Sequence, residues 1–73
     1  MSDLSGETLR DILSTVRPYL AFPSDLEESI EEVSEESSDL KEFEKGLVEL
    51  ISKEEDPSKK ADFRIFLNEL RRR

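Results

Sequence analysis

The sequence contains no cysteine, no histidine, no glutamine and no tryptophan, and it contains only two glycines. Without cysteine, no disulfide can stabilise the 73-residue chain. Without cysteine and histidine, zinc, haem and most transition metals lose their usual protein ligands. The two glycines, Gly6 and Gly46, are too far apart to form a glycine-rich phosphate loop. We therefore expect no bound metal and no cofactor.

The missing histidine also bears on catalysis. A serine nucleophile needs an activating base, which is usually histidine. Carboxylates are abundant, but acid–base catalysis needs one whose pKa is shifted by burial, and the spacing of these residues places them on exposed helix faces. We expect no catalytic residues, no enzymatic activity and no small-molecule substrate.

Long hydrophobic runs are absent too, since no apolar run exceeds four residues. A membrane-spanning helix needs about 20 apolar residues. Residues 1–20 also lack the basic start and apolar centre of a signal peptide. The sequence predicts a soluble protein, cytoplasmic if natural, with no membrane partner.

Apolar residues recur at intervals of three and four, and alternating apolar–polar runs are absent. This pattern predicts amphipathic helices and no strands. We expect an all-α fold, a compact four-helix domain with short loops, in which neighbouring helices are roughly antiparallel. The predicted single domain spans residues 1–73, with helices at about 5–21, 24–37, 39–54 and 57–71.

Several residues predict where the helices begin. The expected caps are Ser5, Ser24 with Glu27 as a capping box, Asp39 with Glu42 as a second one, and Asp56 followed by Pro57. Pro18 leaves two possibilities open for the first helix: it ends there, or it continues with a kink to about Ala21.

The segment 39–53 has the broadest apolar stripe of the chain, which predicts that this helix is central to the core. Gly46 lies within it at a cost to helix stability, so either another helix approaches closely there or the backbone is not idealised. The second helix has few apolar residues and could leave part of the stripe uncovered. We expect a monomer, with a homodimer through this residual apolar surface as the alternative.

The net charge of −8 is distributed unevenly. Residues 24–44 carry ten acidic residues and one basic residue, a net charge of −9, and residues 57–73 carry six basic and two acidic residues, a net charge of +4. A partner that is nucleic acid is disfavoured by the overall charge. The basic residues are expected to complement the dipole of the last helix and to pair with the acidic second helix. The candidate surface for a basic protein partner is formed by Glu28, Glu31, Glu32 and Glu35.

Three apolar residues are candidates for a partner site. Ile65 lies nearly opposite the apolar stripe of the last helix and should be exposed. Tyr19 and Phe22 lie in the connection after the first helix, where they either form an aromatic anchor for a partner or plug one end of the bundle. We favour the plug.

The helix starts Pro23-Ser24-Asp25 and Asp56-Pro57-Ser58, together with the Glu/Lys/Arg surface, resemble those of computationally designed helical proteins. The resemblance implies a scaffold or binder with no natural substrate. Gly46 and Pro18 depart from this style, because neither is an idealised choice within a helix. Natural domains from hyperthermophiles share the composition. The alternative function is a natural acidic interaction domain that binds a basic partner and could imitate the phosphates of nucleic acid.

Overall fold

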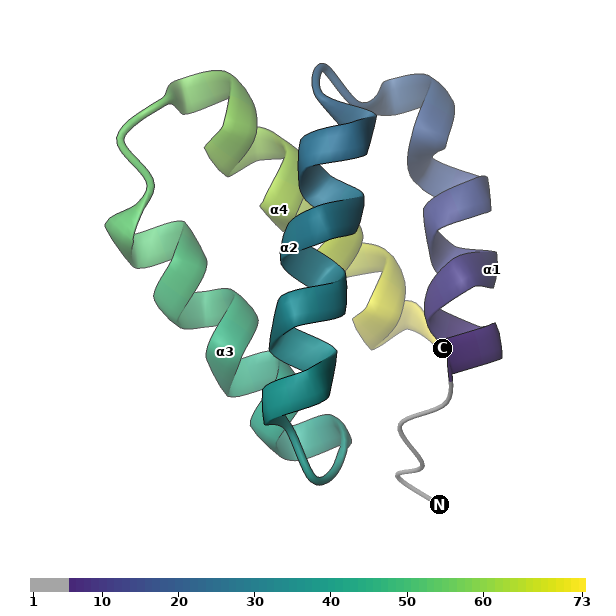
Figure 1. The fold of residues 1–73 in the computed structure, drawn as a ribbon. Coiled ribbons are helices and arrows are strands. Elements are labelled where there is room, and N and C mark those ends of the chain that lie inside the picture. The colour runs from purple at the N-terminus through teal and green to yellow at the C-terminus, as the bar shows by residue number, and fades with distance from the viewer. Residues whose placement is uncertain (1–5) are drawn as a thin grey trace.

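The structure, a computed structural model, describes residues 6–73 as four α-helices and one short 3-10 helix, with no strand in that range (Figure 1). The elements in chain order are α1 (Gly6–Val16), η1 (Arg17–Tyr19), α2 (Pro23–Glu36), α3 (Leu40–Lys53) and α4 (Pro57–Arg72). Short loops join them, and successive helices run in opposite directions (Figure 1). The prediction of an all-α, four-helix fold with short loops is confirmed.

The first α-helix is shorter than predicted. α1 ends at Val16, the chain continues as the 3-10 helix η1, and Leu20 is already extended. Pro18 explains the change, because it has no amide hydrogen to donate to the carbonyl four residues earlier and its ring crowds that carbonyl. The kinked α-helical continuation to Ala21 is therefore wrong. The predicted cap at Ser5 lies outside the described residues.

The start of α2 also differs from the prediction. Pro23 occupies the first turn of the helix, Phe22 is the capping residue, and no side chain caps the helix start. Ser24 therefore lies inside the helix, where it cannot serve as its N-cap. The expected capping box of Ser24 and Glu27 is wrong.

The predicted starts of α3 and α4 are confirmed. The Asp39 carboxylate accepts a hydrogen bond from the Glu42 amide at 2.9 Å, and the Glu42 carboxylate accepts one from the Ser38 amide at 2.7 Å. Asp56 accepts from the Ser58 amide at 2.9 Å. These bonds satisfy amides that the first turns leave without a helical partner, which is why the two helices begin there.

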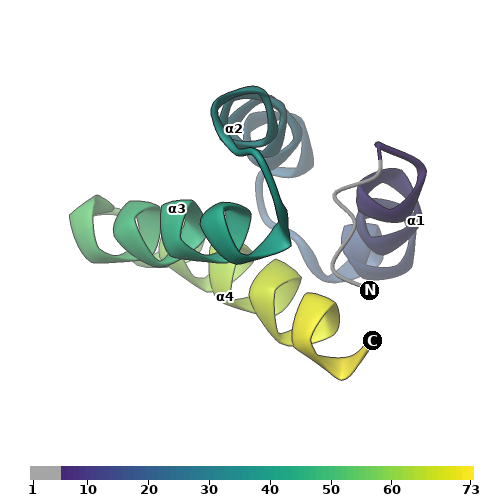
Figure 2. The same ribbon diagram turned by 90° about the horizontal axis from the view of Figure 1, so that it is seen from below.

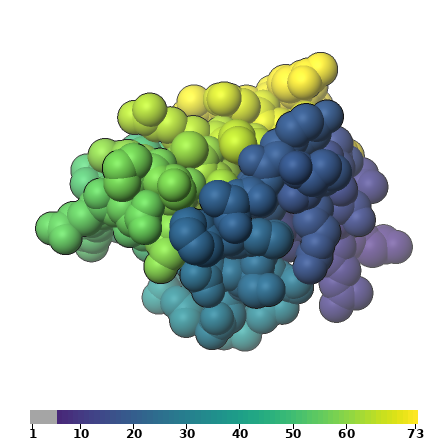
Figure 3. Space-filling model, turned by 90° about the horizontal axis from the view of Figure 1, so that it is seen from above, coloured from purple at the N-terminus to yellow at the C-terminus, as the bar shows by residue number. Residues whose placement is uncertain are grey.

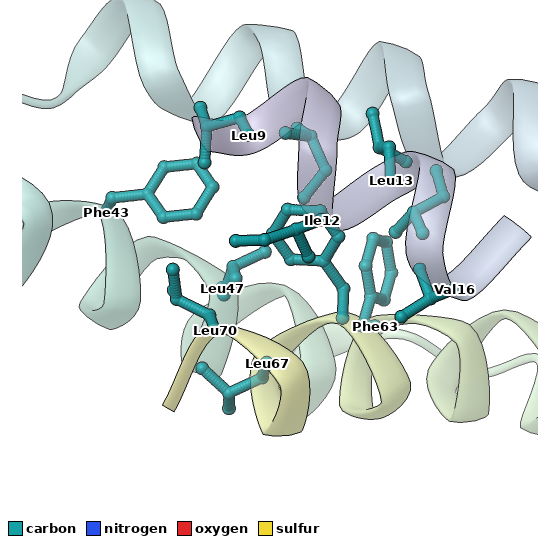
Figure 4. Packing of buried hydrophobic residues seen from close by; sticks show 12 residues of the cluster. Leu9, Ile12, Leu13, Val16, Phe43, Leu47, Phe63, Leu67 and Leu70 are labelled. Atoms are coloured by element: carbon teal, nitrogen blue, oxygen red, sulfur yellow. The ribbon is translucent and has the colours of Figure 1, made fainter. Parts of the chain in front are cut away.

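Twelve hydrophobic residues form one buried core to which every α-helix contributes (Figure 4). The side chains of α1 in this cluster face those of α3 and α4. The core residues are Leu9, Ile12, Leu13, Val16, Leu26, Ile30, Phe43, Leu47, Phe63, Phe66, Leu67 and Leu70.

The helix at the centre of this core is α4. It packs against α1, α2 and α3, whereas α3 packs mainly against α2 and α4. Seen from below, α4 lies between α1 and α3 (Figure 2). The expectation that the segment 39–53 is the central helix is therefore wrong, although that helix is contacted on two sides as predicted.

Gly46 in α3 marks a close approach between α2 and α3. A Cβ atom at this position would lie 2.7 Å from Cγ1 of Val33 in α2, well inside van der Waals contact. A glycine therefore lets the two helices pack more closely than any other residue would allow. Of the two explanations for Gly46, the approach of a neighbouring helix is the one observed.

Candidate functional site

The predicted acidic surface is present on the outer side of α2. Leu26 and Ile30 face the core, and the side chains of the opposite side point to solvent. The exposed residues of this outer side are Glu28, Glu31, Glu32 and Glu35. We call these four residues the acidic face.

No ion pair within residues 6–73 neutralises the acidic face. Two of the C-terminal arginines pair with other helices: Arg71 contacts Glu44 of α3 at 2.6 Å, and Arg73 contacts Asp11 of α1 at 2.5 Å. The hydrogen bond that Arg73 donates to the Asp11 carboxylate raises the pKa of Arg73. Arg72 pairs within α4, with Glu69 at 3.7 Å. The expectation that the basic residues pair with the acidic second helix is wrong for these three arginines, but it holds for Lys59, which pairs with Asp25 of α2.

Among residues 6–73, one cation forms an ion pair with α2. The ammonium group of Lys59, near the start of α4, lies 3.6 Å from the Asp25 carboxylate. It also lies over the ring of Phe22, 5.6 Å from the ring centroid, in the position of a cation–π contact. Lys59 thus bridges the starts of α2 and α4.

These residues line a hollow between α2, the start of α4 and the end of α3, with a volume of about 260 Å³. In the space-filling view, the start of α2 lies directly beside the start of α4 (Figure 3). Leu26 and Phe63 are buried and form the base of this hollow. The residues around them are Phe22, Asp25, Glu28, Ser29, Glu32, Glu54, Lys59 and Asp62. We call this hollow the acidic pocket.

Asp62 holds one edge of the acidic pocket in place. Its side chain is only 3% exposed, and its two carboxylate oxygens accept hydrogen bonds from the amides of Ala21 at 2.9 Å and Phe22 at 2.8 Å. The carboxylate thereby fixes the backbone that presents the Phe22 ring. The sequence interpretation missed this residue. Its position four residues before the buried Phe66, on the same side of the helix, was the available signal.

The three apolar candidates do not form one surface. Tyr19 is 73% exposed and lies by a shallow hollow between α1 and α4, which Ile65 also lines. Phe22 is 39% exposed and belongs to the acidic pocket. The expectation that Tyr19 and Phe22 plug one end of the bundle is therefore wrong.

Ile65 is half-buried and packs against the core, so its predicted exposure is wrong. The cause is the central place of α4. A helix that packs against three others has a wider buried arc than the stripe of Phe63, Phe66, Leu67 and Leu70 indicates.

The remaining surface offers no cluster for a metal. Among residues 6–73, no three acidic side chains come together in an arrangement that could hold a metal ion. None of the helices in this range is long and apolar enough to span a membrane.

The comparison with protein families matched residues 6–73 to the model of the MJ1579 family. The chain belongs to the MJ1579 family. The searches of curated proteins and of solved structures found no match.

Membership of the MJ1579 family corrects the interpretation of origin. The match covers all of the described residues and points to a natural protein, so the interpretation of the chain as a designed or redesigned scaffold is wrong. Of the alternative, a natural acidic interaction domain, the family match supports the natural origin. Both features that departed from the designed style have a structural reason in this family member: Gly46 accommodates Val33, and Pro18 ends α1.

Proposed function

We propose that this member of the MJ1579 family is a non-catalytic interaction domain, and that it binds a basic segment of another protein through the acidic face. The observation that supports this most is the lack of compensation: four exposed carboxylates on one side of α2 have no cation partner within residues 6–73. The arginines at the C-terminal end of α4 form their ion pairs with residues of α1, α3 and α4.

The acidic face also lowers the stability of α2. Glu28 and Glu32 are four residues apart, as are Glu31 and Glu35, and such like-charged pairs cost a few tenths of a kcal/mol each. The last turn of α2 contains no basic residue to complement the helix dipole. A basic partner would relieve this repulsion on binding. The acidic residues would then stabilise the complex, although they destabilise α2 in the free protein.

The experiment is a titration of the protein into a fluorescein-labelled lysine-rich peptide, followed by fluorescence anisotropy at low and high salt. Because exposed charges attract across water, the affinity should fall steeply as salt screens them. Nucleic acid itself should not bind the acidic face, because both are negatively charged. Nucleic-acid-binding proteins with basic surfaces are suitable partners to test next.

A matched pair of variants separates the acidic face from net charge. The first variant replaces three of its residues by glutamine, and the second replaces three exposed glutamates of other elements. The first set is Glu28, Glu31 and Glu35, and the second set is Glu7, Glu49 and Glu55.

Each exposed ion pair contributes up to about 1 kcal/mol. The first variant should therefore bind the peptide about tenfold more weakly than the wild type. The second should bind nearly as well as the wild type. Absence of peptide binding at low salt, or equal losses in the two variants, would refute the proposal.

A further inference from the structure

We infer that the acidic pocket receives one lysine or arginine side chain of the basic partner, which replaces Lys59 in its contacts with Phe22 and Asp25 at the edge of the pocket. This inference rests on the proposed function and deepens it, because it names the group that is recognised and the position where recognition occurs. The acidic face attracts the partner, and the acidic pocket binds one of the partner's side chains.

The pocket has the chemistry of such a side chain. Lysine and arginine combine an apolar stem with a cationic end. The base of the pocket is apolar, formed by Leu26 and Phe63, and its rim is acidic. The rim carboxylates are those of Asp25, Glu28, Glu32 and Glu54.

The size of the pocket favours a single side chain over a small molecule. Sites that bury a drug-sized ligand have volumes of about 300–1,000 Å³. The acidic pocket has about 260 Å³ and is open to solvent on one side through the exposed rim of α2. A side chain that enters from a partner's surface fits this volume and this opening.

Lys59 shows that the pocket accepts a cation. Its ammonium group makes the two contacts that an incoming lysine would make, with the Phe22 ring at 5.6 Å and with Asp25 at 3.6 Å. The side chains of this ion pair are 39% exposed for Lys59 and 55% exposed for Asp25. Pairs this exposed contribute little to stability, so Lys59 can turn out to solvent when a cation of the partner arrives.

The aromatic wall of the pocket is fixed before a partner binds. Asp62 holds the Phe22 amide, and the same carboxylate holds the amide of Ala21. A recognition group whose backbone is already held loses less conformational entropy on binding. The partner's cation therefore meets a ring and carboxylates that are already arranged around a cation.

The test compares Lys59→Ala with Lys60→Ala in the peptide titration. Both substitutions remove one positive charge from the start of α4, and Lys60 forms no ion pair with any of the residues 6–73. If the partner's cation takes over the contacts of Lys59, removal of Lys59 should strengthen peptide binding about fivefold relative to Lys60→Ala, because the cation–π and ionic contacts become free for the peptide.

Phe22→Leu retains apolar volume and removes the aromatic face. This variant should bind the peptide about fivefold more weakly than the wild type, with thermal melting as the check of its fold. In a two-dimensional amide NMR titration, the peptide should shift the signals of Phe22, Asp25 and Ser29 in the wild-type protein.

Three outcomes decide the matter. The two predicted changes of affinity, with shifts at the pocket, support the inference. Equal affinities of Lys59→Ala and Lys60→Ala, with NMR shifts confined to Glu31 and Glu35, overturn the pocket and leave the proposed function standing. Failure of the wild-type protein to bind the peptide at low salt overturns both.

Discussion

The carboxylate of Asp62 in α4 accepts a hydrogen bond of 2.8 Å from the backbone amide of Phe22, forty residues earlier in the chain. Its second oxygen accepts from Ala21 at 2.9 Å. The connection between η1 and α2 has no side-chain cap of its own, so a residue of the central helix satisfies its amides. The bond pair ties the start of α2 to α4 and shapes the acidic pocket.

Replacing Asp62 should therefore lower stability more than replacing an aspartate on the surface would. Asp62→Ala leaves two part-buried backbone amides without their partner. A fully buried group left unpaired costs about 1–3 kcal/mol, and the cost for a part-buried group lies toward the lower end. We expect a loss of about 2–3 kcal/mol in the free energy of unfolding, measured by urea denaturation.

Asp62→Asn is the informative companion, because its amide keeps one acceptor oxygen and presents a donor to the second amide. The free energy of unfolding of Asp62→Asn should lie between those of the wild type and Asp62→Ala. Glu55→Gln, at an exposed position with no ion pair among the described residues, serves as the control and should change stability by less than about 0.5 kcal/mol. A loss this small in Asp62→Ala would show that water replaces the carboxylate.

Asp62 also shows what the sequence could and could not predict. The caps Asp39 and Asp56 act on amides two or three residues away, so their pattern is visible in the sequence. The bonds of Asp62 exist only because α4 packs beside the η1–α2 connection. The spacing from Phe66 indicates that Asp62 faces the core, but no local pattern indicates which amides it binds.

Gly46 provides a test of the contact between α2 and α3. Alanine is favoured over glycine in a helix by about 1 kcal/mol. The added Cβ, however, would lie 2.7 Å from Cγ1 of Val33, and valine has little freedom to rotate in a helix. Crowding of this kind costs about 1–3 kcal/mol, so Gly46→Ala should be destabilising by about 1 kcal/mol in chemical denaturation.

The sign should reverse when Val33 is shortened. In a Val33→Ala background the nearest side-chain atom is the Cβ of residue 33, at 3.8 Å, an ordinary contact. There, Gly46→Ala should stabilise the protein by up to about 1 kcal/mol, as helix propensity alone predicts. A double-mutant cycle without coupling would mean that the helices move apart to accept the Cβ.

The apolar stripe of the last helix predicted its buried hydrophobic residues, Phe63, Phe66, Leu67 and Leu70, because burial of one face is a property of the helix itself. The apolar stripes did not predict which helix is central. The segment 39–53 has the broadest stripe, but its edge residue Val48 is 45% exposed. α4, with a narrower stripe, buries Asp62 and half-buries Ile65 as well. The arrangement of the helices in space determines whether residues at the edge of a stripe are buried. The periodicity of one segment does not predict that arrangement.

The acidic face should affect stability and binding in opposite directions. Glu31→Gln and Glu35→Gln each remove like-charge repulsion, and glutamine and glutamate have similar helix propensity. Each should raise the free energy of unfolding by about 0.5 kcal/mol, or the melting temperature by about 2–4 °C. Each should also weaken binding of the basic peptide.

Salt provides the control for this prediction. The gain in stability should shrink as salt rises, because screening removes the repulsion from the wild-type protein as well. A variant that is damaged would lose both stability and binding, so the two measurements together distinguish damage from a lost recognition surface. A substitution that lowers both quantities would contradict the assignment of Glu31 or Glu35 to an exposed, unpaired face.

The surroundings of Val48 bear on whether the exposed edge of α3 forms a contact between two copies of the chain. Its exposed side chain lies among charged residues, which leaves only a small apolar patch. These neighbours are Lys41, Glu44, Lys45, Glu49 and Arg71. Because a stable dimer buries a larger, mainly apolar surface, we expect a monomer in analytical ultracentrifugation.

Val48→Lys should then leave the sedimentation coefficient unchanged and alter the free energy of unfolding by less than about 0.5 kcal/mol, as is usual for surface substitutions. Leu50, the half-buried residue at the other edge of the stripe, is the matched comparison. Leu50→Lys should be clearly destabilising, because it removes apolar contacts with the core. A wild-type dimer that Val48→Lys dissociates would instead identify the α3 edge as a contact between copies.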